Sequence, residues 1–295
     1  MSAILLFGIF FALLLLKTSI GIALAVSAIC VLFYLNGFTG FELITDIMYA
    51  SVAKFALLAI PFFILAGVIM EYAGISRRLI NFAQSLVGHY KSGMVFVTAL
   101  VACFFAAISG SGPATVAAIG GILIPALMKS GVKKETAAGL VASTGAIGII
   151  IPPSIAFIIF GVVAGDTVPV SIGRLFIAGI IPGILMAVAL VLATMYVRWK
   201  DDRKDEKEGR HVGQEVAVTS QRATLTEIGK SFIQAFWGLM VPVIILGGIY
   251  GGFFTPTEAA VVSVFYGLIV GMFIYREIKI QDLYNIFVDA SIQTA

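Results

Sequence analysis

The segment from Ser109 to Thr115 contains the residues best suited to bind a small charged ligand. It reads Ser-Gly-Ser-Gly-Pro-Ala-Thr and lies between two apolar stretches, roughly 93–108 and 114–128. Each stretch is shorter than the about 20 apolar residues that cross a bilayer comfortably. Two short apolar arms joined by a polar tip predict a re-entrant helical hairpin over 93–130. Non-helical backbone at membrane depth persists only where protein or a water-filled cavity satisfies it, so the tip is a candidate site for an ion or a polar substrate.

The tip offers oxygen ligands that carry no formal charge. Ser109 and Ser111 supply hydroxyls, and the glycine that follows each of them leaves backbone carbonyls exposed. The entering arm ends with unpaired carbonyls, which attract a cation. The returning arm, opened by Pro113, begins with free N–H groups, which attract a carboxylate. A packing contact of small residues between helices is the alternative interpretation.

A second segment of similar character runs from Gly145 to Ser154. Its tandem prolines remove two backbone donors inside an apolar stretch and predict a broken helix over 134–163. Neutral oxygens suit Na⁺, whereas zinc would favour His or Cys ligands. Ser154 opens the second half-helix and is a candidate donor to a bound anion; a plain proline kink is the alternative. The carbonyls that the break can turn into a cavity are those of Gly145, Gly148 and Ile151.

A third motif, from Thr255 to Ala260, precedes an apolar stretch and fits a helix N-terminus. Thr255 suits the cap, and the helix dipole favours Glu258 in the first turn. A proton relay through Glu258 is the alternative, although ionisable relays lie within spans rather than at their ends. The two histidines are isolated, and no metal-ligand spacing, catalytic triad or phosphate loop is present.

These motifs belong to a chain that is 60% hydrophobic and 12% charged. Soluble domains carry about 25% charged residues, so the composition predicts a polytopic helical membrane protein. The net charge of +3 is scattered over loops, which excludes nucleic acid as an expected partner. Cys30 and Cys103 lie in apolar stretches and are expected to be small buried hydrophobes rather than a disulfide.

Charge predicts the orientation. We place the N-terminus in the periplasm, let each span cross the membrane once, and let the hairpin return to the side from which it enters. Of the 19 Lys and Arg residues, only Lys54 and Arg174 then lie on the periplasmic side. The hairpin then enters from the cytoplasm, and the charged loop over 200–221 is a solvated cytoplasmic linker. Spans are predicted over about 3–16, 19–35, 55–72, 172–199, 236–250 and 258–275, with a mixed segment over 41–54 and a linker helix over 77–90.

A weak internal repeat appears when the sequence is shifted by about 236 residues. Residues 44–47 (Ile-Thr-Asp-Ile) fall on 280–283 (Ile-Gln-Asp-Leu), and the span pair over 3–35 falls near the pair over 236–275. The predicted topology makes the two units inverted, as in many secondary transporters. The shift places a second hairpin tip beyond residue 295, so the chain is expected to hold one repeat and the beginning of another.

Together the three motifs resemble the large membrane (M) subunit of tripartite ATP-independent periplasmic (TRAP) transporters, across essentially the whole chain. The resemblance implies an all-α polytopic membrane protein, an inverted-repeat elevator-type transporter with a re-entrant hairpin and a broken transmembrane helix. It implies Na⁺-coupled import of an organic acid anion, such as a C4-dicarboxylate, sialic acid or another sugar acid, across the bacterial inner membrane. The implied partners are a small four-helix membrane subunit (Q type) and a periplasmic substrate-binding protein (P type).

The resemblance also assigns residues. One Na⁺ site falls to Ser109, Ser111, Gly145, Gly148, Ile151 and Pro153. Substrate contacts fall to Ser111, Pro113, Thr115 and Ser154. A second Na⁺ site is expected in a C-terminal part that family members have beyond this segment.

The implied domains are scaffold helices over 1–90 with an interfacial arm over 41–54, a transport-domain half over 91–165, a long span and inter-repeat loop over 166–221, and the start of the second repeat over 222–295. Two alternatives stay open: a free-standing ion-coupled anion carrier of similar construction, and a non-transporting membrane scaffold. An enzyme is not expected, because no pair of catalytic groups lies within the spans.

Overall fold

The described part of the chain is mostly helical. The computed structural model describes residues 2–90, 92–165, 167–207 and 223–294, and no strand occurs in these ranges. The prediction of an all-α protein is therefore confirmed. Most of the predicted loop over 200–221 lies outside the described residues. The chain divides into two compact units, Met1–Lys54 and Phe55–Ala295, which are considered separately.

The first unit holds three helices. They are α1 (Ser2–Leu15), α2 (Ile20–Asn36) and α3 (Thr39–Val52). Helices α1 and α2 are apolar and pack on each other, and α2 also packs on α3. Gly40 permits the close approach of α3, because a Cβ there would lie 2.9 Å from the carbonyl oxygen of Leu32. The predicted mixed segment over 41–54 thus corresponds to α3.

The second unit contains the helices that can cross a membrane. Its elements are η1 (Phe55–Leu58), α4 (Ala59–Tyr72), α5 (Ile75–Val87), α6 (Gly93–Ser109), α7 (Gly112–Lys129), α8 (Lys134–Ile150), α9 (Ile155–Ala164), α10 (Ile172–Lys207), α11 (Leu225–Tyr250), α12 (Pro256–Ile269), the π-helical turn η2 (Val270–Ile274) and α13 (Asp282–Thr294). Among the described residues, five helical segments are long and apolar enough to span, and α8 with α9 adds a bent sixth. The polytopic prediction is supported.

Several helix bounds differ from the predictions, two of them by more than one helical turn. Helix α10 continues beyond 199 to Lys207, and α11 begins at Leu225 rather than 236. The early start of α11 has a local cause: Thr224 and Glu227 form a reciprocal capping box, in which the Thr224 N–H donates to Glu227 Oε2 over 2.8 Å. A cap of this kind satisfies N–H groups of the first turn, so the helix begins in polar sequence ahead of the apolar stretch.

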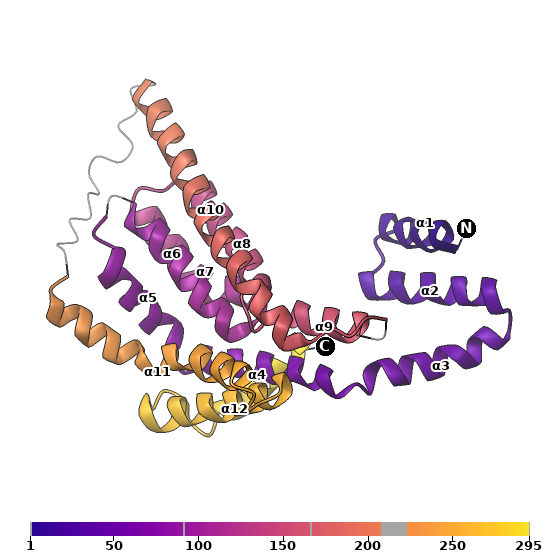
Figure 1. Cartoon of the computed structure of the whole chain (residues 1–295). Helices are drawn as coiled ribbons and strands as arrows, with labels where there is room; N and C mark the ends of the chain where they lie inside the picture. Colours follow the sequence, from indigo (N-terminus) through magenta and orange to yellow (C-terminus); the bar gives the residue numbers. More distant parts are fainter. Residues whose placement is uncertain (1, 91, 166, 208–222, 295) are drawn as a thin grey trace. The chain divides into compact units, whose positions relative to one another are not determined.

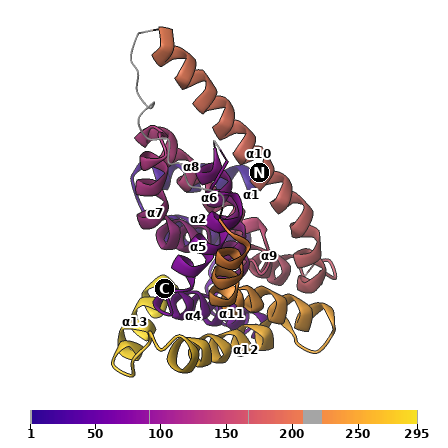
Figure 2. The same ribbon diagram turned by 90° about the vertical axis from the view of Figure 1, so that its left-hand side faces the viewer.

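The second unit has two apolar cores. One lies mainly among α4, α5, α11, α12 and α13, and the other among α5, α6, α7, α8 and α10. Both views show α4, α11 and α12 close together, and α6, α7 and α8 close together (Figures 1 and 2). Ser109 ends α6 and Ser154 caps α9, and each of these helices contributes one buried residue to the first core, Ile108 and Ile158.

The Thr255 motif is a helix cap, as predicted. Glu258 Oε2 accepts hydrogen bonds from the Thr255 N–H at 2.8 Å and the Thr255 hydroxyl at 2.9 Å. The Glu258 N–H donates in return to Thr255 Oγ1 over 3.3 Å. This capping box opens α12. Helix α12 begins at Pro256, which lies 236 residues after Ile20, the first residue of α2, so the two starts match the shift of the repeat. The inverted relation of the two sequence repeats stays a prediction.

Arg78 joins the α4–α5 turn to the segment after α12. Its guanidinium donates to the carbonyls of Ala73 and Gly74 at 3.1 Å each, and to Glu277 Oε1 at 2.6 Å. It also lies over the ring of Tyr275, 3.9 Å from the centroid. Ala73 is the C-cap of α4, where helix carbonyls lack intrahelical donors, so the Arg78 side chain supplies one there.

We expect Arg78→Ala to lower the free energy of unfolding by about 1–3 kcal/mol, since it removes charge-assisted hydrogen bonds and a cation–π contact. Arg77→Ala on the exposed side of α5 is the matched control and should change stability little. Thermal unfolding of the purified protein in detergent measures both. Equal unfolding midpoints for the two variants would contradict this role.

Candidate ion and substrate site

The polar tip is the turn of a helical hairpin. Helix α6 ends at Ser109, and Gly110 adopts the left-handed conformation at φ +61°, with its N–H donating to the Ala106 carbonyl over 2.9 Å. Glycine is the residue that takes this conformation without steric cost. Ser111 then caps α7, accepting from the Ala114 N–H at 3.5 Å. The hairpin predicted over 93–130 is observed, although α7 at 18 residues is itself long enough to count as a span.

Two side chains and one backbone carbonyl of the tip form a buried network. The hydroxyl oxygens of Ser109 and Thr115 lie 3.0 Å apart, and Thr115 Oγ1 donates to the Ser111 carbonyl over 2.8 Å. The Ser109 hydroxyl also lies 3.3 Å from that carbonyl. Ser109 is 1% exposed and Thr115 is fully buried, so these oxygens gather in a region shielded by protein.

The broken helix supplies backbone carbonyls. Helix α8 ends at Ile150, α9 begins at Ile155, and the two are bent by 41°. In a continuous helix the carbonyls of Gly148 and Ile149 would accept from residues 152 and 153, but both are prolines and have no N–H. The Ser154 hydroxyl donates to the Ile149 carbonyl instead. The Gly148 carbonyl is left without its usual helical donor.

The tip and the break meet directly. The Ile155 N–H, which a continuous helix would offer to the Ile151 carbonyl, donates to the Gly110 carbonyl over 3.1 Å. A Cβ on Gly110 would lie 2.5 Å from the Pro153 carbonyl oxygen. The C-terminal ends of α6 and α8 and the N-terminal ends of α7 and α9 thus meet at one place. Carbonyl ends that favour a cation adjoin N–H ends that favour an anion.

Two further glycines let α8 lie against the tip. A Cβ on Gly112 would lie 2.5 Å from the Gly145 carbonyl oxygen. A Cβ on Gly148 would lie 2.7 Å from Thr115 Oγ1 and 3.0 Å from the Ser111 carbonyl oxygen. The absence of side chains at these positions therefore brings the backbone of α8 into contact with the oxygens of the tip.

The structure brings most of the assigned residues together. Those that meet at the contact of tip and break are Ser109, Ser111, Gly145, Gly148, Pro153 and Thr115. The Ile151 side chain instead packs toward Gly183 of α10. Pro113 lies at the same turn and is exposed. These placements leave the assigned roles as predictions.

The Ser154 hydroxyl, expected to donate to a bound anion, is already hydrogen-bonded within the protein. Its hydroxyl accepts from the Phe157 N–H at 3.3 Å, which caps α9, and donates to the Ile149 carbonyl. The side chain is fully buried. A bound anion would have to replace the Ile149 carbonyl as the acceptor of this proton.

The donor set fits a hard monovalent cation. The oxygens that converge are hydroxyls and carbonyls, which are neutral and suit Na⁺ better than a soft or strongly charged transition metal. No group of three His, Cys, Asp or Glu residues with metal-binding proximity occurs in the described ranges. A cation here would be bound by dipoles rather than by a carboxylate.

Gly67 of α4 also lies at the tip, although no motif pointed to it. A Cβ on Gly67 would lie 3.4 Å from both Cα and Cβ of Ser109. Helix α4 therefore forms part of the wall behind the hairpin turn. The available signal was an isolated glycine inside an apolar helix, which often marks a close approach of another backbone.

A helical hairpin whose tip meets a broken helix inside a set of apolar spans defines a class of protein, the membrane transporters with discontinuous helices at the binding site. The family model "Tripartite ATP-independent periplasmic transporter, DctM component" matches residues 7–295. The chain belongs to this family, and the resemblance noted from its motifs is confirmed.

Three relatives illustrate the match. The isethionate TRAP transporter permease protein DctMQ of Oleidesulfovibrio alaskensis is 42% identical over 97% of this chain and 42% of its own length. The C4-dicarboxylate TRAP transporter large permease protein DctM of Rhodobacter capsulatus is 35% identical over 100% of this chain and 66% of its own. The sialic acid TRAP transporter permease protein SiaT of Haemophilus influenzae is 39% identical over 83% of this chain and 37% of its own.

These relatives are named as permeases, which confirms that the chain belongs to a transport family and not to an enzyme family. The chain spans between 37% and 66% of the length of these three relatives.

We expect Gly148→Ala to lower the free energy of unfolding by about 1–3 kcal/mol, because its methyl group would overpack against Thr115 and the Ser111 carbonyl. Gly139→Ala is the matched control on α8, since a Cβ there meets nothing within 4 Å. Removing a helical glycine at that open position should be neutral or stabilise by up to about 1 kcal/mol. Thermal unfolding in detergent separates the two, and equal effects would contradict the close contact.

Proposed function

We propose that the chain is part of a Na⁺-coupled importer of an organic acid anion in the bacterial inner membrane. The observation that carries the proposal is the meeting of the Ser109–Thr115 tip with the break between α8 and α9, where neutral oxygens and four helix ends converge. Membership of the DctM family supports it. The relatives named for C4-dicarboxylate, sialic acid and isethionate support an anionic substrate of low molecular mass.

In this proposal Na⁺ binds at the carbonyl ends of α6 and α8. Ser109 and Ser111 provide oxygens from the tip, and the carbonyls of Gly145, Gly148 and Ile151 provide them from the break, with Pro153 beside Gly110. Bound Na⁺ supplies positive charge next to the N-terminal ends of α7 and α9. The substrate anion then binds near Ser111, Pro113, Thr115 and Ser154, and its charge offsets that of the cation. Cation and anion therefore favour each other's binding, which is the requirement for coupled transport.

The proposal includes the partners and the motion that the family resemblance implies. A periplasmic substrate-binding protein delivers the anion, and a small four-helix membrane subunit supports the scaffold. The hairpin and broken helix move as an elevator domain relative to that scaffold. Binding at discontinuous helices near mid-membrane, with alternating access around the site, is the general arrangement of such carriers.

The proposed orientation has a periplasmic N-terminus and places the base of the hairpin in the cytoplasm. The α7–α8 turn and the charged end of α10 lie at one end of the second unit: Arg198 donates to the Ser130 carbonyl over 3.2 Å, and Lys133 pairs with Asp201 at 3.5 Å. Basic residues from two distant parts of the sequence therefore share one side. Because Lys and Arg are enriched on the cytoplasmic side of membrane proteins, we assign this end of the second unit to the cytoplasm.

The Na⁺ site is tested by Ser109→Ala combined with Ser111→Ala in the reconstituted full-length transporter with its partners. Loss of two hydroxyl ligands should raise the Na⁺ concentration for half-maximal uptake by about 10-fold or more, since hydrogen-bonding and ligand oxygens typically contribute 1 kcal/mol or more each. Ser143→Ala on the exposed side of α8 is the control and should leave the Na⁺ dependence unchanged. The same half-maximal concentration in both variants would reject the site.

The orientation is tested with single cysteines at the two ends of the broken span. Lys134→Cys should react with a membrane-impermeant maleimide only from the cytoplasmic side, and Thr167→Cys only from the periplasmic side. Both positions are exposed. Labelling of intact cells against inverted vesicles measures this, and the reverse pattern would contradict the proposed topology.

A further inference from the structure

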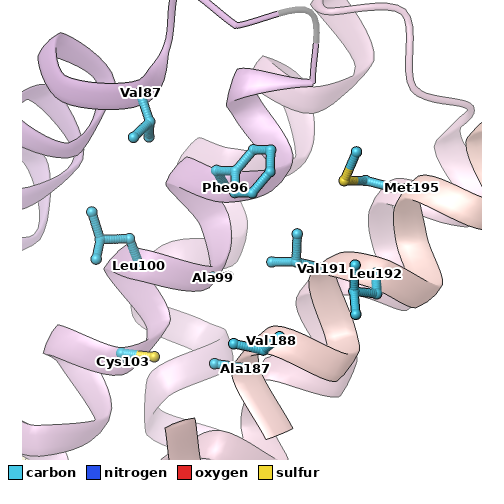
Figure 3. A pocket seen from close by; sticks show the side chains of 10 residues that line it. All are labelled: Val87, Phe96, Ala99, Leu100, Cys103, Ala187, Val188, Val191, Leu192 and Met195. Carbon is cyan, nitrogen blue, oxygen red and sulfur yellow. The ribbon is translucent and has the colours of Figure 1, made fainter. Parts of the chain in front are cut away.

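An apolar groove runs between α6 and α10. Phe96, Leu100 and Cys103 line it from α6, and Val188, Val191 and Met195 face them from α10 (Figure 3). Val87 at the end of α5 also lines it. The groove has a volume of about 310 Å³ and is open along one side, and every residue that lines it is apolar.

The length of the groove matches one leaflet of a bilayer. Its α10 residues run from Ala187 to Met195, which is about 12 Å at 1.5 Å per residue. Half of the hydrocarbon core of a bilayer is about 15 Å. Helix α10 is apolar and long enough to span from Ile172 to Asp201, so the groove lies in the part of the span nearest its charged end. A groove at this depth faces hydrocarbon chains.

Aromatic and cationic side chains continue the groove beyond Met195. Trp199 lies one helical turn further on the same face of α10, and Tyr196 packs against it with ring centroids 6.1 Å apart. Arg203 follows by another turn, with its guanidinium 4.0 Å from the Trp199 ring. Lys200 is exposed beside them, whereas Asp201 is paired with Lys133. Tyr and Trp typically mark the headgroup level, and basic residues there attract anionic lipid.

We propose that this groove is a binding site for a phospholipid with an anionic headgroup. One acyl chain lies along Phe96, Cys103, Val188 and Met195, and the headgroup phosphate lies at the level of Lys200 and Arg203. The apolar lining accounts for the chain, and the Lys200 and Arg203 side chains beside Trp199 account for the preference in headgroup. The lipid covers a face between α6 and α10 without forming part of the ion site, so the inference is independent of the proposed function.

Quenching of Trp199 tests the site. Full-length protein in detergent is titrated with phosphatidylglycerol or phosphatidylcholine carrying brominated acyl chains, and the Trp199 signal is the difference from a Trp199→Phe variant. Half-maximal quenching should require about 5-fold less phosphatidylglycerol than phosphatidylcholine, as expected for one or more cations near an anionic headgroup. Lys200→Gln combined with Arg203→Gln should remove this preference and leave quenching by phosphatidylcholine.

A groove-filling pair of variants makes the test specific. Val188→Phe places a ring in the groove and should weaken quenching by phosphatidylglycerol at least about 5-fold, because it takes the space of several methylene groups. Val197→Phe makes the same change at an exposed position of α10 that does not line the groove. Equal quenching by the two lipids, or equal effects of the two Phe variants, would overturn the proposal.

Discussion

The organisation of the candidate site depends on backbone groups that two adjacent prolines release at membrane depth. In hydrocarbon, each carbonyl or N–H without a partner costs several kcal/mol, so a helix break survives only where something else supplies the missing bonds. Here the Ser154 hydroxyl donates to the Ile149 carbonyl, and the Ile155 N–H donates to the Gly110 carbonyl of the hairpin. The break and the tip are therefore each incomplete alone, and their contact pairs the Ile155 N–H of the break with the Gly110 carbonyl of the tip.

The same constraint explains why small residues dominate the site. Gly110 turns the chain in the left-handed conformation, while Gly145 and Gly148 let α8 reach the tip. Larger residues would separate the two backbones and leave their polar groups exposed to an apolar environment. Helix α4 supports the arrangement through Gly67, so the wall of the site extends beyond the hairpin and the broken helix.

Much of this arrangement follows from local sequence. Tandem prolines, a glycine-rich polar tip and capping residues act within a few positions, so the hairpin, the break and the cap at Thr255 could be predicted. The bond between Ile155 and Gly110, the contact of Gly67 with Ser109 and the internal bonding of Ser154 depend on how distant segments pack. No spacing in the chain encodes them. The early start of α11 was missed for another reason, because its capping box lies in polar sequence ahead of the apolar stretch.

Binding of Na⁺ to the folded protein is the most direct test of the central claim, since it requires neither substrate nor partner. A ligand that binds only the folded state raises the unfolding temperature in proportion to ln(1 + [L]/Kd). Replacing K⁺ by Na⁺ at constant ionic strength should raise the unfolding midpoint of the detergent-solubilised full-length protein. The rise should disappear when Ser109 and Ser111 are both changed to Ala, and persist in Ser143→Ala. An equal midpoint in Na⁺ and K⁺, or an undiminished Na⁺ effect in the double variant, would contradict a cation site at the meeting of tip and break.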